Sequence, residues 1–206
     1  VGCRLLYPDG RIQHAGGVLH WPRAVPDHRG YREADDKRWD DVADVDYVTG
    51  AAWGFRRSLV DAIGFLDDAF WPGYYEEVDF CFRAKKAGYR VVYSPTASAV
   101  HDESAVFERA SKRYLTAFHR NRLRFVLKWR SLSEFVTDFL PAEQAWLERD
   151  LSPEERKVMV GAYKQTLRGL VSLCASRGDS LPSEAEFHDA LDVLIALHGA
   201  ALERAD

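Results

Sequence analysis

The chain has 206 residues, of which 47% are hydrophobic and 29% are charged, a composition that suits a soluble globular protein with a real core. Its formal net charge of -4 and pI near 6.0 argue against nucleic acid as the main partner, because phosphate binding requires a net basic face. Its apolar runs fall short of the roughly 18 to 20 residues that a spanning helix needs. Cys3, Cys81 and Cys174 are scattered, so we expect buried thiols in a reducing compartment.

The first elements expected along the chain are extended. A strand is predicted over residues 1–7, and the turn residues Pro8-Asp9-Gly10 lead into a second extended run over 11–20. Pro and Gly at these positions favour a tight turn, so the two runs predict a hairpin. Residues 22–46 are polar and acid-rich without a sustained period. They predict an exposed loop.

Short strands and helices are expected next. A strand is predicted over residues 47–55, and helices are predicted over 58–63 and 77–87. Gly64 and Gly88 follow the two helices, where a glycine in the left-handed region can end a helix. Two extended pieces then follow, over 89–93 and 97–101, and Pro95 separates them. The order of strand, helix and strand indicates an α/β fold.

From about residue 104 the pattern becomes helical. A long helix is predicted to about Trp129, and Pro141 closes a short segment after it. Strong start signals predict two more helices, one from Ser152-Pro153 to about Ser176 and one from Pro182-Ser183 to about Glu203. This change predicts two regions, 1–103 and 104–206.

One segment combines turn residues, paired acids and a basic helix. It runs from Tyr74 to Tyr93 with the sequence YYEEVDFCFRAKKAGYRVVY. Glu76, Glu77 and Asp79 stand where the helix begins, and carboxylates there interact favourably with the helix dipole. Taken alone, the acids are explained by helix stabilisation, and the spacing of Asp79 and Arg83 is explained by a structural ion pair.

The same segment resembles the inverting glycosyltransferases of family 2, especially the rhamnosyl- and related transferases of bacterial surface polysaccharides. Those enzymes show a tyrosine-rich turn, an acidic pair, an aspartate two residues on, and an arginine-bearing helix that ends in Ala-Gly-Tyr. Residues 8–16, 48–51 and 95–101 also follow the family in order and spacing. The resemblance covers about residues 1–103 and implies the C-terminal, acceptor-side half of a GT-A type (Rossmann-like) mixed sheet, followed by an α-helical extension.

The resemblance also implies roles for single residues. Glu77 stands where the family usually has an aspartate as general base, so its carboxylate lies one methylene further out; a carboxylate within hydrogen-bond reach of an acceptor hydroxyl can remove its proton. Glu76 is the neighbour that positions the acceptor, and adjacent carboxylates raise one another's proton affinity. The acceptor-binding residues implied are Gly50, Ala51, Trp53, Tyr74, Tyr75 and Asp79.

A divalent metal is implied as well. His101 stands where related transferases hold Mn²⁺ or Mg²⁺ against the departing diphosphate, although many relatives have a second histidine where this chain has Asp102. His14 is given no role. The D-x-D pattern at Asp44-Val45-Asp46 is rejected as the family's metal motif, because that motif ends an apolar strand further upstream. We therefore expect the nucleotide-binding half to lie outside these 206 residues and the chain alone to be a poor catalyst.

The activity implied is transfer of a hexosyl or deoxyhexosyl group from a nucleotide-sugar donor to a saccharide or lipid-linked acceptor, with inversion. The place implied is the cytoplasm of a bacterium, in polysaccharide biosynthesis. The alternative is a noncatalytic module in which a degenerate transferase fold docks a protein partner or a membrane. For the C-terminal helices, packing on the first region and homo-oligomer formation both stay open.

The long helix and the residue after it are rich in positive charge. A solvated helix face explains the charge without any function. The functional alternative is peripheral attraction to anionic lipid headgroups at the inner face of the membrane. The basic residues concerned are Arg109, Lys112, Arg113, Arg120, Arg122, Arg124, Lys128 and Arg130.

Overall fold

The structure is a computed structural model that describes residues 1–102, 111–149, 151–175 and 182–203. These residues fall into two compact units. The α/β unit contains residues 1–20 and the described part of 25–107, and the helical unit contains residues 21–24 and the described part of 108–206. The predicted boundary at 103–104 lies outside the described residues.

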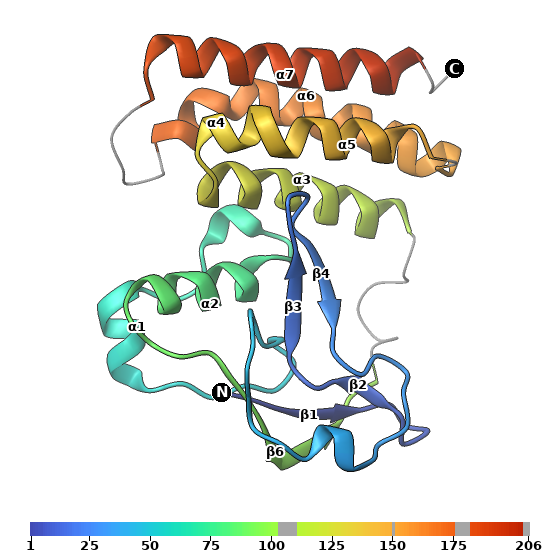
Figure 1. The fold of residues 1–206 in the computed structure, drawn as a ribbon, viewed down its shortest axis with the longest axis vertical. Helices are drawn as coiled ribbons and strands as arrows, with labels where there is room; N and C mark the ends of the chain where they lie inside the picture. The colour runs from blue at the N-terminus through green and yellow to red at the C-terminus, as the bar shows by residue number, and fades with distance from the viewer. Residues whose placement is uncertain (103–110, 150, 176–181, 204–206) are drawn as a thin grey trace. The chain divides into compact units, whose positions relative to one another are not determined.

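A mixed sheet forms the base of the α/β unit (Figure 1). Its strands are β1 (Gly2–Leu6), β2 (Ile12–His14), β5 (Ala43–Asp44) and β6 (Val92–Val100), in the order β2-β1-β6-β5. β1 is parallel to β6 and antiparallel to β2, and β5 is antiparallel to β6. This mixed sheet with helices confirms the α/β class.

The predicted turn after β1 is present. Gly10 has a φ of 83° and donates its N–H to the Tyr7 carbonyl at 2.9 Å. The extended run over 11–20, however, divides at Gly16, which has a φ of 92°. There the chain leaves the mixed sheet and continues as β3 (Gly17–His20), which pairs with β4 (Val25–His28).

Two expectations for the middle of this unit were wrong. The loop predicted over 22–46 contains β4, the short 3-10 helix η1 (Lys37–Trp39) and β5. The signal was weak because β4 has a proline and an aspartate, which strands tolerate only at edges. Conversely, the strand predicted over 47–55 is reduced to single bridges, Tyr47 with Gly17 and Trp53 with Gly2.

Pro95 does not end the last strand of the sheet, contrary to expectation. β6 runs through it, and the pairing with β1 shifts from Cys3–Ser94 to Arg4–Ser98. The residues between, including the proline that lacks an N–H, lie in an irregularity of the ladder. A bulge of this kind accommodates a proline without losing a ladder hydrogen bond.

Helices α1 (Arg57–Ile63) and α2 (Glu76–Lys86) lie beside each other in Figure 1. They confirm the two predicted short helices. Gly64 donates its N–H to Val60 O at 2.8 Å, and Gly88 has a φ of 85°, so both glycines end their helices as expected. Phe80 of α2 is buried against the apolar side of α1.

The helical unit consists of α3, α4, a π-helical segment η4, α5, α6 and α7, whose long members lie side by side (Figure 1). Their bounds are Lys112–Trp129, Leu132–Glu134, Phe135–Phe139, Leu140–Leu147, Pro153–Ala175 and Glu184–Glu203. Residues 104–110 and 176 of the predicted helices lie outside the described residues.

The predicted helix starts are confirmed. Ser152 Oγ accepts the Glu155 N–H at 3.1 Å, and Ser183 and Glu186 bond each other reciprocally. Pro141, by contrast, does not close a segment. It is the second residue of α5, which follows directly on the π-helical segment η4, an irregularity of the kind that accompanies a proline inside a helix.

A buried charged cluster lies at the centre of the helical unit. Glu143 accepts hydrogen bonds from Arg122 at 2.9 Å, Arg23 at 2.7 Å and the Tyr163 hydroxyl at 2.8 Å. Although burial acts to raise it, the two guanidinium groups bring the pKa of Glu143 down to about 2. The inclusion of Arg122 in an exposed basic face was therefore wrong, because its side chain is fully buried.

No helix in the described stretches is long and apolar enough to cross a membrane. Cys81 and Cys174 are buried free thiols, as expected, while Cys3 is only half-buried.

Candidate active site

A strained turn precedes the acidic pair, Glu76 and Glu77, at the start of α2. Tyr74 and Tyr75 both adopt left-handed backbone conformations, with φ of 72° and 74°, and Tyr75 is the N-cap residue. For residues other than glycine this conformation costs on the order of 1–2 kcal/mol each. Such strain persists only where the surrounding structure holds it, and it concentrates at functional sites. Here the turn places Glu76 and Glu77 as the first two residues of the helix.

The two carboxyl groups are partly enclosed and unpaired. Each residue is half-buried, and the Oε2 atoms of Glu76 and Glu77 are inaccessible without a hydrogen-bond partner. Neither glutamate forms an ion pair with another described residue. A buried carboxylate without a cation holds its proton more tightly than one in water.

The pKa of Glu77 is raised to about 8, chiefly by burial and also by the neighbouring Glu76, while the backbone N–H groups of Glu77 and Val78 act in the opposite direction. The pKa of Glu76 is also raised, chiefly by burial. A carboxyl group with a pKa near the working pH is well matched to proton transfer. Acid–base chemistry is therefore the chemistry that this pair can do.

A glycine turn lies next to the pair. A Cβ built on Gly50 would lie 4.0 Å from Glu77 Cβ, and Gly50 itself is exposed and outside the left-handed region. Ala51 follows it in the same exposed turn. The structure thus brings together Gly50 and Glu77, which are separated by 27 positions in the sequence.

Two buried tyrosines are neighbours of Glu77, Tyr75 in the sequence and Tyr47 in space. Tyr75 and Tyr47 are 2% and 1% exposed, and the Tyr47 hydroxyl donates to the Asp27 carbonyl at 3.1 Å. Burial raises the pKa of Tyr47, and the nearby Glu77 contributes in the same direction. Tyr47 was not singled out by the sequence, because a tyrosine in a supposed strand carries no functional signal.

Asp79 is turned away from solvent. Its side chain is fully buried and pairs with Arg83 at 2.8 Å. The guanidinium of Arg83 in turn donates to the carbonyl of Ile63 at 2.7 Å and to that of Phe65 at 2.5 Å. Asp79 therefore ties α2 to the segment after α1, which is a supporting arrangement.

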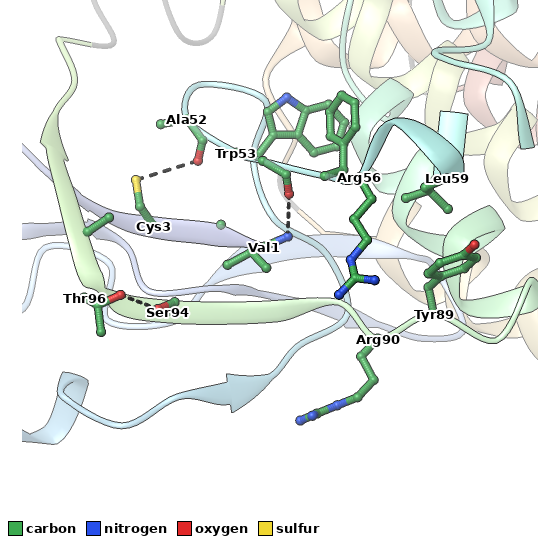
Figure 2. A pocket seen from close by; sticks show the side chains of 14 residues that line it. Val1, Cys3, Ala52, Trp53, Arg56, Leu59, Tyr89, Arg90, Ser94 and Thr96 are labelled. Atoms are coloured by element: carbon green, nitrogen blue, oxygen red, sulfur yellow. Dashed lines mark hydrogen bonds between the residues drawn. The ribbon is translucent and has the colours of Figure 1, made fainter. Parts of the chain in front are cut away.

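Trp53 lies at a separate cavity of about 660 Å³, shown in Figure 2. Its ring packs on Phe55 and Phe80, with centroids 5.2 and 5.0 Å away. Arg56 and Tyr89 also line the cavity, but neither Glu76 nor Glu77 does. Trp53 thus lines a cavity to which the acidic pair does not contribute.

His101 is held by Gln13. Its Nδ1 lies 2.7 Å from Gln13 Oε1, and the Gln13 amide nitrogen faces the His101 carbonyl at 3.4 Å. The histidine therefore donates from Nδ1, the arrangement in which the neutral ring presents its lone pair on Nε2, as a metal-binding histidine does. However, no group of three or more His, Cys, Asp or Glu side chains suited to a metal gathers in the described part of the chain.

Comparison with known proteins places the chain among relatives of sugar transferases. No protein-family model matches the chain. It is 36% identical over 113 residues to the uncharacterized protein y4gI of Sinorhizobium fredii, and this match covers 51% of this chain and 12% of that protein. It is 31% identical over 81 residues to the low-salt glycan biosynthesis hexosyltransferase Agl10 of Haloferax volcanii, covering 38% of this chain and 25% of the relative.

A third relative extends the likeness further along the chain. The N-acetylglucosaminyl-diphospho-decaprenol L-rhamnosyltransferase of Mycobacterium tuberculosis is 29% identical over 140 residues, covering 61% of this chain and 44% of the relative. The chain thus spans less than half the length of each of these three relatives. Two of these three relatives are named as sugar transferases.

Proposed function

We propose that this chain carries the acceptor-side, catalytic-base part of an inverting glycosyltransferase of family 2, with Glu77 as the general base. The observation that carries the proposal is the half-buried carboxyl of Glu77, whose Oε2 has no partner and whose pKa is raised to about 8. The sequence resemblance and the named sugar transferases among the relatives favour the same chemistry.

In the proposed reaction, an acceptor hydroxyl binds beside Glu77 and loses its proton to the carboxylate. The oxygen forms a bond to the anomeric carbon from the face opposite the leaving group, while the bond from that carbon to the nucleotide diphosphate breaks and the diphosphate leaves with the electron pair. One such displacement inverts the anomeric centre. Glu76 supports the basicity of Glu77, since two close carboxylates disfavour simultaneous ionisation.

We propose that the acceptor lies over the Gly50–Ala51 turn, where the missing side chain at Gly50 leaves the approach to Glu77 open. Tyr74 would then lie next to the sugar, with the buried Tyr75 behind it and Asp79 holding α2 in place. The named rhamnosyltransferase suggests a lipid-diphosphate-linked saccharide as acceptor and an activated deoxyhexose as donor, on the cytoplasmic side of a membrane. His101 is proposed as one ligand of a divalent ion whose other donors lie outside the described residues.

The test is a transfer assay with the natural full-length protein that contains these residues. Nucleotide-activated L-rhamnose serves as the first donor, and an N-acetylglucosaminyl-diphospho-lipid serves as the first acceptor. Glu77→Gln keeps the shape of the side chain but cannot take up a proton, and general-base catalysis contributes about 100-fold to 10,000-fold. We expect kcat to fall by that factor while donor binding is retained.

Glu76→Gln is the matched control, because it makes the same change one residue away. We expect a much smaller loss of kcat, since it removes only the influence of Glu76 on its neighbour. Turnover retained in Glu77→Gln would remove Glu77 from the base role, whereas no turnover in the wild type would favour a noncatalytic docking module.

A further inference from the structure

A buried histidine lies behind the Gly50 turn. His14, the last residue of β2, is 0% exposed, and its Nε2 accepts the backbone N–H of Thr49 at 3.4 Å. Its ring packs edge-on against His28 with centroids 4.7 Å apart and lies 5.8 Å from the ring of Tyr47. A fully buried polar ring of this kind is retained only where its contacts offset the cost of burying it.

Thr49 connects this histidine to the turn. Its N–H bonds His14, and its Oγ1 accepts the N–H of Ala51 at 3.5 Å. These two contacts enclose Gly50, whose Cβ position lies 4.0 Å from Glu77 Cβ. A continuous set of contacts therefore runs from His14 through Thr49 to the backbone beside Glu77.

Glycines fix the segment that leads into this turn. A Cβ on Gly17 would overlap the ring of Tyr47, and a Cβ on Gly2 would lie 2.6 Å from Val48 Cβ. In addition, Gly17 donates its N–H to the Tyr47 carbonyl at 2.9 Å. Residues 47–48 thus pack directly against the backbone of β1 and β3. If Thr49 shifts, these two residues cannot move to compensate.

We propose that His14 is a positioning residue that holds the Thr49–Ala51 turn against the start of α2, and thereby sets the distance between the acceptor and Glu77. The inference rests on the proposed function, since it assigns the turn to the acceptor. An apolar side chain of similar size would fill the space but leave the Thr49 N–H without its acceptor.

The chemistry of the ring fits this task. Accepting the Thr49 N–H requires a lone pair on Nε2, hence a neutral imidazole with its proton on Nδ1. Burial, together with the charges of His28 and Arg29, lowers the pKa of His14 well below its usual value, so the ring stays neutral at physiological pH. Glutamine can present a carbonyl oxygen at a similar reach, whereas phenylalanine cannot.

The experiment compares His14→Phe and His14→Gln in the natural protein, with hydrogen exchange of the Thr49 amide measured by NMR and transfer measured with the same donor and acceptor as above. We expect His14→Phe to lose protection of the Thr49 amide and to lower kcat on the order of tenfold, since small misplacements of reacting groups have effects of at least this size. The donor KM should be unchanged. His14→Gln should restore both protection and kcat.

His119→Phe is the control, because His119 is a buried histidine of the helical unit, 2% exposed and bonded to Glu155. It should leave kcat unchanged. If His14→Phe does not fold, Thr49→Val, which removes only the Oγ1 acceptor, should lower kcat in the same direction by a smaller factor.

Three results would overturn the inference: Thr49 protection unchanged in His14→Phe, an equal loss of kcat in His119→Phe, or a kcat that stays at the wild-type level once Thr49 protection is lost. None of these concerns Glu77, whose role is decided separately by Glu77→Gln. If Glu77→Gln retained turnover, the proposed function would fail and this inference with it, even where the exchange data show the His14 contact.

Discussion

Replacing Glu77 by glutamine should stabilise the protein, and the gain should grow with pH. A carboxyl group whose pKa is raised in the folded state binds its proton more tightly there than in the unfolded chain. Its contribution to stability is therefore fully present below the unfolded pKa of 4.5 and is lost as the pH rises through the folded pKa of about 8. Glutamine has no proton to lose, so the variant escapes this loss.

The size of the effect follows from the interval between those two values. At about 1.4 kcal/mol per pH unit, the free energy of unfolding of the wild type should fall by about 4–5 kcal/mol relative to that of Glu77→Gln between pH 4 and pH 9. Most of the change should fall between pH 4.5 and 8. Urea unfolding of both proteins across this range, followed by tryptophan fluorescence, measures the difference, which reports Glu77 together with its coupled neighbour Glu76 because the remaining titrating groups are common to both.

Glu33→Gln provides the control in the same unit. Glu33 is exposed and pairs with Arg38, and exposed ion pairs contribute about 0–1 kcal/mol. The free energy of unfolding of Glu33→Gln should differ from that of the wild type by no more than this amount at every pH. If the curve for Glu77→Gln also ran parallel to that of the wild type, the carboxyl of Glu77 would be as well solvated as that of Glu33, and the reasoning from its burial would be refuted.

Three further outcomes follow from the contacts. Asp79→Asn should destabilise the α/β unit by about 3 kcal/mol in urea unfolding, because it leaves the guanidinium of Arg83 without its buried partner; an unchanged midpoint would contradict this. Gly50→Ala should keep or slightly raise stability, since the nearest atom is 4.0 Å away, yet lower transfer on the order of tenfold or more by obstructing the acceptor; full activity would place the acceptor elsewhere. The pKa of Glu143 is lowered to about 2, so its charge stabilises the fold above pH 4.5 and this stabilisation is lost as the pH falls toward 2. Glu143→Gln should therefore lower the free energy of unfolding by about 3 kcal/mol at pH 7 and by progressively less below pH 4.

The sequence was informative where local rules decide the structure. Gly64 and Gly88 end their helices because a glycine enters the left-handed or similar regions freely. Ser152 and Ser183 start theirs because a side-chain oxygen satisfies a free N–H. The acids at the start of α2 were expected there because carboxylates interact favourably with the helix dipole. In each case the residues concerned lie within one turn of the feature that they form.

Long-range features were missed. Nothing local indicates that β4 forms, because Pro26 and its neighbours acquire strand geometry only by pairing with β3. The sequence placed Arg122 among the surface charges of its helix, and its burial is explained by the ion pair with Glu143 from another helix. Likewise, the link from His14 to Thr49 joins residues 35 positions apart. The adjacent glycines at positions 16 and 17 were the one local sign that another segment approaches closely there.

The central claim is that Glu77 is an enclosed, unpaired carboxyl group that takes up a proton near neutral pH. Carbon-13 NMR of the side-chain carboxyl, assigned by comparison with Glu77→Gln and titrated from pH 4 to pH 10, measures this without any substrate. We expect an inflection near pH 8 in the wild type, and a lower one, still above 4.5, in Glu76→Gln, because burial remains there while the contribution of Glu76 is removed. An inflection at the ordinary value near 4.5 would contradict the account.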